Sequence, residues 1–272
     1  MTSRRPPQTV GYASWVYGTG PSAGDHTEDF HEASRLYPGV VDADVIGGSL
    51  LERSLDMRAS AGRSVLRRTG LPAIELPPPR PLSGGVERAL RARRSTRTYG
   101  DEPIAPDELS SLLGAAYGVT AALDEQKLRS VPSGGALYPL ELYVAAVRVE
   151  AIARGLYHYD PLRNVLERIR RLRAAELEGL TPYDELLLPS AAVVAISAVF
   201  WRSRFKYGAR AYRFALLEAG HVAQNFLLAA TTLGLSSCPV GGFFDRAVDT
   251  LLGIDGLHEA SLYLLPVGRP AS

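Results

Sequence analysis

The chain of 272 residues contains one cysteine, Cys238, which excludes an internal disulfide and a cysteine-rich metal site. A lone cysteine is usually a small buried residue, and we expect the same here. The formal net charge is only +1, so no overall field favours nucleic acid or a membrane surface. No apolar run is long enough to span a membrane, and residues 1–7 lack the apolar core of a secretory signal. These absences predict a cytoplasmic protein with neither nucleic-acid nor membrane partners.

Residues 1–83 are predicted to form an N-terminal extension, joined by a proline-rich connector at 77–81 to one domain at 84–272. The hydrophobic share of 46% at this length is enough for a large core in that domain. Helical patterning within the extension is seen at 29–36 and 50–66. A dimer-contacting arm or a substrate-access element is the expected role.

Two features of the extension imitate functional sites. The stretch Gly18–Gly24 is rich in glycine, but it follows no clear strand and has no Gly-Lys-Ser/Thr sequence, so it is interpreted as connecting chain rather than a phosphate loop. His26 and His31 have no carboxylate or cysteine framework around them. No metal site is predicted.

From residue 84 onward, helical and strand patterns alternate and predict an α+β architecture. Strands are expected at 140–147, at 191–200, at 261–267 and in a hairpin across 155–169, and helices at 106–117, 210–233 and 245–252, the last capped by Asp245. The hairpin carries His158, for which a structural role is favoured over a catalytic one. The arrangement indicates a mixed central sheet flanked by helices, one of them long and central.

A basic cluster follows a short helical pattern that places Val86, Ala89 and Leu90 on one face. It contains Arg93, Arg94, Ser95 and Arg97 within five residues. Guanidinium groups bind phosphate oxygens in a bidentate manner, and a serine hydroxyl adds another donor. The cluster therefore suits a phosphate, although an exposed basic turn has the same composition.

Glycines interrupt the chain at two further places where a ligand could approach the backbone. One is the loop Pro132, Ser133, Gly134, Gly135, Ala136, Leu137 directly before a buried strand, and the other is the Gly241–Gly242 pair. An ordinary loop before a strand also uses glycine and proline. Near the end of the domain, Arg269 is a second possible phosphate partner.

The adjacent residues Lys206 and Tyr207 precede the long helical pattern and form a potential acid–base couple. In a closed pocket a nearby ammonium favours the phenolate, and loss of water favours the neutral amine. Such a pair can supply a base near neutral pH. By itself, a lysine beside a tyrosine is more often part of an ordinary helix start.

The order of these motifs over residues 84–270 resembles the flavin-dependent nitroreductase fold, and within it the SagB-type dehydrogenases, which oxidise azolines to azoles in peptide natural products. The resemblance implies an FMN cofactor. It also implies that the residues around FMN are Arg93, Arg94, Ser95, Arg97, Pro132, Ser133, Gly134, Gly135, Leu137, Gln224, Asn225, Gly241, Gly242 and Arg269. Glu218 and Gly220 match the helix that carries Gln224 and Asn225 in this branch. Lys206 and Tyr207 match the pair to which the branch assigns proton removal.

The implied activity is oxidation of thiazoline or oxazoline rings to thiazole or oxazole in a modified peptide, with oxygen as the implied electron acceptor and a cyclodehydratase complex as a possible partner. General nitroreductases share the flavin elements but not the Lys-Tyr pair. Three alternatives remain: a flavin reductase of nitro or quinone compounds, a dehydrogenase of another peptide, and a flavin-binding subunit without turnover.

The long helical pattern also indicates a homodimer. The stretch Phe226–Ala230 is nearly continuously apolar, which predicts burial on all sides by a second copy. Small residues such as Ala219 and Ala223 would permit close approach. The resemblance places the flavin sites at the interface of such a dimer.

Overall fold

The computed structural model describes residues 29–30, 54, 56, 65–66, 68, 70–82, 84–123, 126–182 and 184–271. The chain divides into two compact units, residues 1–41 and 42–272. In the first unit only Asp29 and Phe30 are described, and both are helical. The glycine-rich stretch at 18–24, both histidines of the extension and nearly all of its two expected helices lie outside the described residues.

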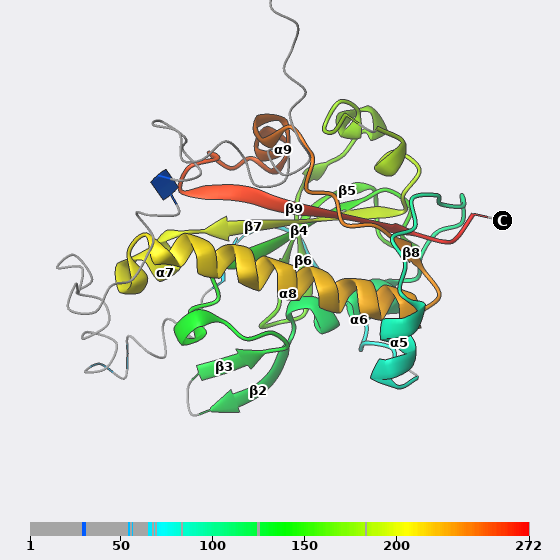
Figure 1. The fold of residues 1–272 in the computed structure, drawn as a ribbon. Coiled ribbons are helices and arrows are strands. Elements are labelled where there is room, and N and C mark those ends of the chain that lie inside the picture. The colour runs from blue at the N-terminus through cyan, green and yellow to red at the C-terminus, as the bar shows by residue number, and fades with distance from the viewer. Residues whose placement is uncertain are drawn as a thin grey trace, which may run out of the picture. The chain divides into compact units, whose positions relative to one another are not determined.

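The second unit is built on a seven-stranded sheet with the order β1-β6-β5-β4-β7-β9-β8 (Figure 1). Its strands are β1 (Ala73–Glu75), β4 (Leu140–Ala146), β5 (Gly155–Asp160), β6 (Val165–Arg171), β7 (Ala192–Val199), β8 (Ser236–Ser237) and β9 (Glu259–Gly268). The edge strand β1 precedes the proline-rich connector, so part of the predicted extension is paired into this sheet. A separate hairpin consists of β2 (Val119–Leu123) and β3 (Gln126–Arg129).

Every strand pair of the seven-stranded sheet is antiparallel, so the predicted mixed sheet is wrong in this detail. Short turns connect β5 to β6, which forces them to run in opposite directions. Between β7 and β9 the chain crosses the sheet lengthwise twice, first as a long helix and then through a segment on the other face. Two passes return it to the end where β7 finished, and Val199 there pairs with Glu259.

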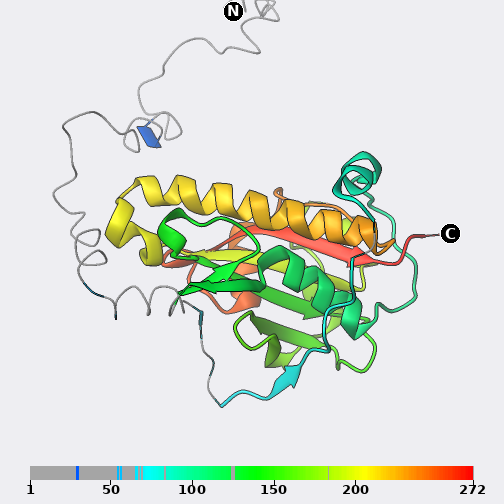
Figure 2. The same ribbon diagram turned by 90° about the horizontal axis from the view of Figure 1, so that it is seen from below.

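In the described part of the second unit, the longer helices are α5 (Val86–Ala92), α6 (Pro106–Tyr117), α7 (Trp201–Tyr207), α8 (Arg210–Thr232) and α9 (Asp245–Leu252). Short 3-10 helices cover Gly134–Ala136, Ala174–Leu177 and Asp184–Leu186. The 23 residues of α8 span roughly 34 Å and lie along one face of the sheet beside α6 (Figure 2). On the other face lies α9 (Figure 1). No described helix combines the length and apolarity needed to cross a bilayer.

The core has one layer on each face of the sheet. Along β4, Leu142 and Val144 point into the layer that α6 and α8 cover, whereas Tyr143 and Ala145 point into the layer under α9. This alternation follows from the two-residue period of a strand. Buried Cys238 confirms the expectation from composition.

The α+β architecture and its main elements are confirmed, from the helix that begins at Pro106 to the final strand. Asp245 is the first helical residue of α9 rather than its cap, because the cap position belongs to Phe244. Helical spacing of apolar residues along α8 predicts a buried Leu217, but the structure leaves this residue 62% exposed. Phe226–Ala230 is largely buried by its own chain, so its apolarity no longer indicates a second copy.

Candidate active site

The Lys206–Tyr207 pair forms the C-terminal end of α7, which stops at Gly208 with φ 52° and ψ −139°. Glycine adopts this backbone conformation without the steric penalty that a Cβ would bring. The lysine Nζ lies 5.3 Å from the centroid of the Tyr207 ring. That ring packs edge-to-face against Phe214 of α8, with centroids 5.0 Å apart. Both side chains are half-buried, so they reach solvent from a packed position.

The glycine loop predicted at 132–137 lies directly against this pair. It contains a short 3-10 turn, Gly134–Ala136, in which Gly135 has φ 62°. A Cβ on Gly135 would lie 2.7 Å from the Tyr207 hydroxyl and 3.1 Å from Lys206 Nζ. Leu137 turns inward and is 1% exposed, which anchors the loop to the core. The structure therefore brings the predicted acid–base couple and the glycine loop together.

Behind this loop lies the buried carboxyl group of Glu218, on α8. It accepts a 2.7 Å hydrogen bond from the Tyr117 hydroxyl and is also hydrogen-bonded to Ser133. Burial raises the pKa of Glu218 to about 7, although the bonds to Ser133 and Tyr117 and the charge of Arg129 oppose the rise. Sequence reasoning placed Glu218 on a motif helix without a role, because nothing in the sequence links it to Ser133.

The basic cluster lies elsewhere, beside β8. The backbone amide of Thr96 in this cluster donates a hydrogen bond to the carbonyl oxygen of Ser237 in β8. Arg97 is exposed and lines a cavity of about 440 Å³ together with Gly241, Gly242 and Cys238. No atom would contact a Cβ built on Gly242 within 4 Å, so a ligand has room to approach its backbone. This volume falls within the roughly 300–1,000 Å³ typical of small-molecule sites.

The other two arginines of the cluster bind protein atoms. Arg93 donates to the Ser95 hydroxyl at 3.4 Å. Arg94 turns back to the carbonyl oxygens of Arg91 and Arg93, at 2.9 and 2.8 Å, where α5 ends. Cationic side chains are favourable at that end of a helix.

Arg269 and Asn225 likewise hold the fold together. The guanidinium of Arg269 makes a bidentate pair with Glu108, with both N–O distances at 2.9 Å. Asn225 donates to the carbonyl oxygens of Ala115 and Ser130, and this joins α8 to α6 and to the chain ahead of the glycine loop. Gln224, next to it on α8, is exposed.

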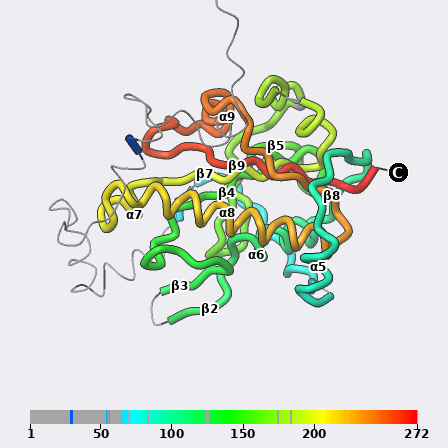
Figure 3. Tube along the Cα trace, in the orientation of Figure 1, coloured from blue at the N-terminus to red at the C-terminus, as the bar shows by residue number. Residues whose placement is uncertain are grey.

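The predicted site residues therefore form two groups at opposite ends of α8 (Figure 1). Lys206, Tyr207 and the glycine loop lie at the end that follows α7. The basic cluster and the Gly241–Gly242 pair lie at the end near α5 and β8. Figure 3 shows α8 running from the end beside α7 to the end near α5 and β8. Within one chain, the two groups do not form one pocket.

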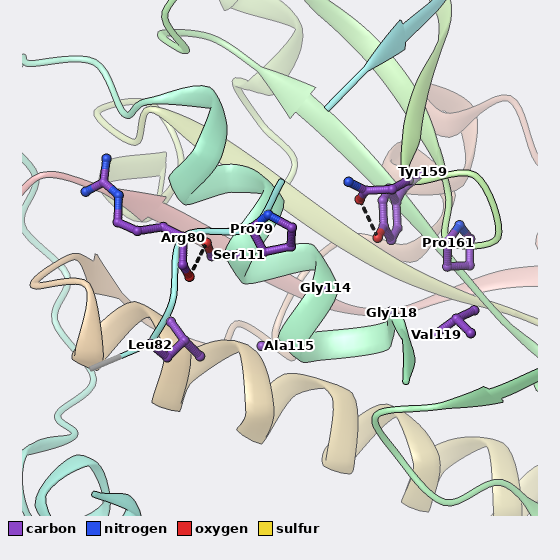
Figure 4. Close-up of a pocket in the computed structure, with 11 residues that line it drawn as sticks. Pro79, Arg80, Leu82, Ser111, Gly114, Ala115, Gly118, Val119, Tyr159 and Pro161 are labelled. Atoms are coloured by element: carbon purple, nitrogen blue, oxygen red, sulfur yellow. Dashed lines mark hydrogen bonds between the residues drawn. The ribbon is translucent and has the colours of Figure 1, made fainter. Parts of the chain in front are cut away.

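A second cavity of about 380 Å³ lies between the proline-rich connector, α6 and the turn from β5 to β6 (Figure 4). Pro79, Leu82, Val119 and Pro161 give it mainly apolar walls. Its polar groups are paired within the protein, as in the 3.0 Å bond from the Tyr159 hydroxyl to Asn164. No sequence motif pointed to this cavity.

Comparison with known proteins identifies the family to which the chain belongs. The sequence profile of the nitroreductase family matches residues 90–269, which include both groups. The chain belongs to the nitroreductase family. This nitroreductase-family chain is 40% identical over 185 residues to MJ1384 of Methanocaldococcus jannaschii, a protein that carries a nitroreductase name. The match covers 68% of this chain and 90% of MJ1384.

Two other relatives are named as processing proteins, one for microcin B17 and one for trifolitoxin. The microcin B17-processing protein McbC of Escherichia coli is 34% identical to this nitroreductase-family chain, over 49% of this chain and 52% of McbC. The trifolitoxin-processing protein TfxB of Rhizobium leguminosarum is 30% identical, over 54% of this chain and 41% of TfxB. The matches thus span about half the length of these two proteins.

Solved structures confirm the nitroreductase-like fold. A nitroreductase from Ralstonia eutropha superposes with a TM-score of 0.64 at 28% identity, covering 77% of this chain and 96% of that one. A chain of the Escherichia coli microcin synthetase McbBCD complex, with truncated pro-MccB17 bound, superposes with a TM-score of 0.58 at 24% identity. That match covers 90% of this chain and 92% of the other, and it supports the fold.

Proposed function

We propose that this protein is an FMN-dependent dehydrogenase that oxidises thiazoline or oxazoline rings to thiazole or oxazole in a modified peptide. The observation that carries the proposal is the contact of Lys206 and Tyr207 with the glycine turn at Gly135. A reductase needs no such proton-accepting pair beside its flavin loop, whereas removal of a ring proton does. The kinship with McbC and TfxB, which are named as processing proteins for microcin B17 and trifolitoxin, supports the same substrate class.

The residues of the basic end fit FMN. Arg97 offers a charged donor for the phosphate, and the open backbone at Gly242 lets a planar ring approach. Ser95 is half-buried beside them. Arg93 and Arg94 would have to exchange their bonds to protein atoms for bonds to phosphate. FMN, when bound, supplies the two-electron acceptor that takes up hydride.

We propose a homodimer in which the start of α8 from one copy lies beside the end of α8 from the other copy. An exposed stripe with helical spacing runs along α8 through Tyr212, Leu216, Leu217, Gly220, His221 and Gln224. Leu216 and Leu217 are 44% and 62% exposed, which is unusual for neighbouring leucines on a helix packed against a sheet. Two stripes crossing antiparallel place the Lys206 end of one copy near the Arg97 end of the other. Such an interface is isologous, as most dimer interfaces are.

In this arrangement the chain has two chemical tasks. It orients the azoline ring over the glycine turn, and it takes the acidic ring proton onto Lys206 Nζ or the Tyr207 phenol oxygen. One ring C–H bond would thus lose its proton to Lys206 or Tyr207, and FMN would supply the acceptor for the hydride of another ring C–H bond. The ring gains one double bond and becomes aromatic. A cyclodehydratase that makes the azoline in a cytoplasmic complex is the proposed partner.

The test is a mass loss of two hydrogens in a heterocycle-bearing peptide incubated with flavin-loaded protein under air. Lys206→Ala and Tyr207→Phe should retain FMN and lose oxidation by about 10²–10⁴-fold, the usual effect of removing a general base. Lys127→Ala, a change at an exposed lysine of the β2–β3 hairpin, is the matched control and should behave like the unaltered protein. Colourless protein that cannot be reconstituted with FMN would refute the proposal.

The second candidate is a flavin reductase of nitro or quinone compounds that uses a nicotinamide donor. The longer match to MJ1384 favours it, because it covers nine-tenths of a protein with a nitroreductase name. Rapid nicotinamide-dependent reduction of a nitroarene, unaffected by Lys206→Ala and without azoline oxidation, would establish this second function instead.

A further inference from the structure

Arg202 lies one turn ahead of Lys206 on α7 and contacts two different parts of the molecule. Its Nη2 makes an ion pair with the Glu141 carboxylate of β4. Its Nη1 donates to the carbonyl oxygen of Tyr138, at the end of the glycine loop, at 3.3 Å. The Arg202 side chain is only 14% exposed. One guanidinium group therefore joins α7, the sheet and the glycine loop.

Glu141 is a rigid anchor for this guanidinium. It is 2% exposed, and its second oxygen lies 2.7 Å from Nε2 of His158. Its first oxygen also accepts a 2.9 Å hydrogen bond from the Leu66 amide. Burial opposes the charge on this carboxyl, but Arg202 and His158 outweigh burial and lower the pKa of Glu141 to about 2. The carboxylate is thus ionised across the physiological range and fixed on three sides.

The helix that Arg202 holds has little stability of its own. It contains seven residues, fewer than the roughly 12–15 that an isolated helix needs to persist in water. Its rotation and position must come from side chains that contact the rest of the protein. Arg202 and Lys206 are four residues apart and therefore share one face of α7. Fixing the guanidinium also fixes the direction in which the lysine leaves the helix.

We propose that Arg202 is a positioning residue that holds Lys206 and Tyr207 against the Gly134–Gly135 turn. Its planar fork reaches the Glu141 carboxylate and the Tyr138 carbonyl together, which a lysine ammonium on a flexible stem does not reproduce. The inference rests on the proposed function for its catalytic consequence. Its structural part, the ordering of α7, can be measured without any substrate.

The catalytic experiment compares flavin-loaded Arg202→Lys and Arg202→Ala with the unaltered protein on an azoline peptide. We expect kcat to fall about 100-fold in Arg202→Ala, the order of loss that a 1 Å misplacement produces. KM and flavin content should stay within about twofold. Arg202→Lys should retain an intermediate kcat, because it restores the charge but not the fork. Arg204→Ala is the matched control on the same helix, since Arg204 is exposed and stacks on Trp201.

The structural experiment measures hydrogen exchange of the 201–207 amides in the same four proteins. Faster exchange confined to α7 in both Arg202 variants, with the sheet unchanged, supports the proposal. Wild-type kcat together with wild-type protection of α7 in Arg202→Ala overturns it, as does an equal effect of Arg204→Ala. Loss of protection throughout the sheet in both Arg202 variants overturns it in favour of a general structural role. If the unaltered protein oxidises no azoline, the proposed function fails, and exchange at α7 alone decides the inference.

Discussion

Gly135 and Tyr207 occupy adjoining space, so that a Cβ on the glycine would lie 2.7 Å from the tyrosine hydroxyl. The same glycine has φ 62°, in the left-handed region that other residues rarely adopt. The backbone conformation therefore favours glycine, and the lack of space for a Cβ requires it. This requirement ties the sequence of the loop to the position of the acid–base couple.

Gly135→Ala should displace the Tyr207 hydroxyl and reduce azoline oxidation by an order of magnitude or more, as expected when a reacting group moves. The left-handed backbone should also destabilise the fold by about 1–3 kcal/mol. Gly179→Ala is the matched control, because Gly179 has φ 68° but no atom within 4 Å of its Cβ position. Thermal unfolding and turnover are measured for both. Equal activity in the two variants would show that the contact with Tyr207 is unimportant.

Leu217→Glu should convert the proposed dimer into monomers and weaken FMN retention, because a charge would then lie in the middle of an apolar interface. Light scattering reports the mass, and absorbance of the gel-filtered protein reports the flavin. Leu257→Glu places the same charge on an even more exposed leucine that is not part of α8, and should change neither. A Leu217→Glu protein that remains dimeric with its flavin would rule out the α8 stripe as the interface.

Arg97→Ala and Arg269→Ala should have different effects, although both residues were predicted to contact phosphate. Arg97 lines the open cavity, so its loss should weaken FMN binding by about 1.5–3 kcal/mol without affecting the fold. Loss of Arg269 leaves buried Glu108 without its bidentate partner, which should cost about 3 kcal/mol of unfolding free energy. Denaturant titration and flavin titration separate the two. If Arg269→Ala loses flavin at full stability, Arg269 is a phosphate ligand.

Glu218 should make stability depend on pH in the direction opposite to most carboxylates. Its pKa rises from the usual 4.5 to about 7 on folding, so the fold favours the neutral acid. The stabilisation is complete below pH 4.5 and is lost as pH rises through 7, in total about 3 kcal/mol at 1.36 kcal/mol per unit. Relative to Glu218→Gln, the unaltered protein should therefore lose stability across this range. Glu87→Gln, at a carboxylate 78% exposed, should show no such trend.

The sequence predicted the α+β architecture well because its signals are local. Pro106 and the acidic residues after it mark a helix start, and the alternation around the turn at Asn164 marks a hairpin. Strand direction is not local. The direction of β9 relative to β7 depends on how many times the chain crosses the sheet between them. No local sequence pattern indicates that number. The β2–β3 hairpin was not predicted, since its strands have only five and four residues and show no regular alternation of apolar and polar positions.

The candidate site was predictable in its motifs but not in its partnerships. Gly135 and Tyr207 meet although 72 positions separate them in the sequence, and only the fold reveals the contact. Arg269 was predicted to bind phosphate because nothing in the sequence around it indicates that it pairs with Glu108. Arg202 and Glu141 carried no motif at all. Whether the motif residues bind FMN and remove a proton stays a prediction.

Because α8 contacts both groups of site residues, its length sets the distance between them. Phe214 near its start touches the glycine loop, and its last turn adjoins the chain that leads to Gly241. One inserted residue would advance the far end by 1.5 Å and rotate it by about 100°. Insertions in the surface loops leave the spacing intact, whereas a single insertion in this helix would shift every residue on one side relative to the other. A change in the length of α8 would therefore change both the distance and the relative orientation of the two groups.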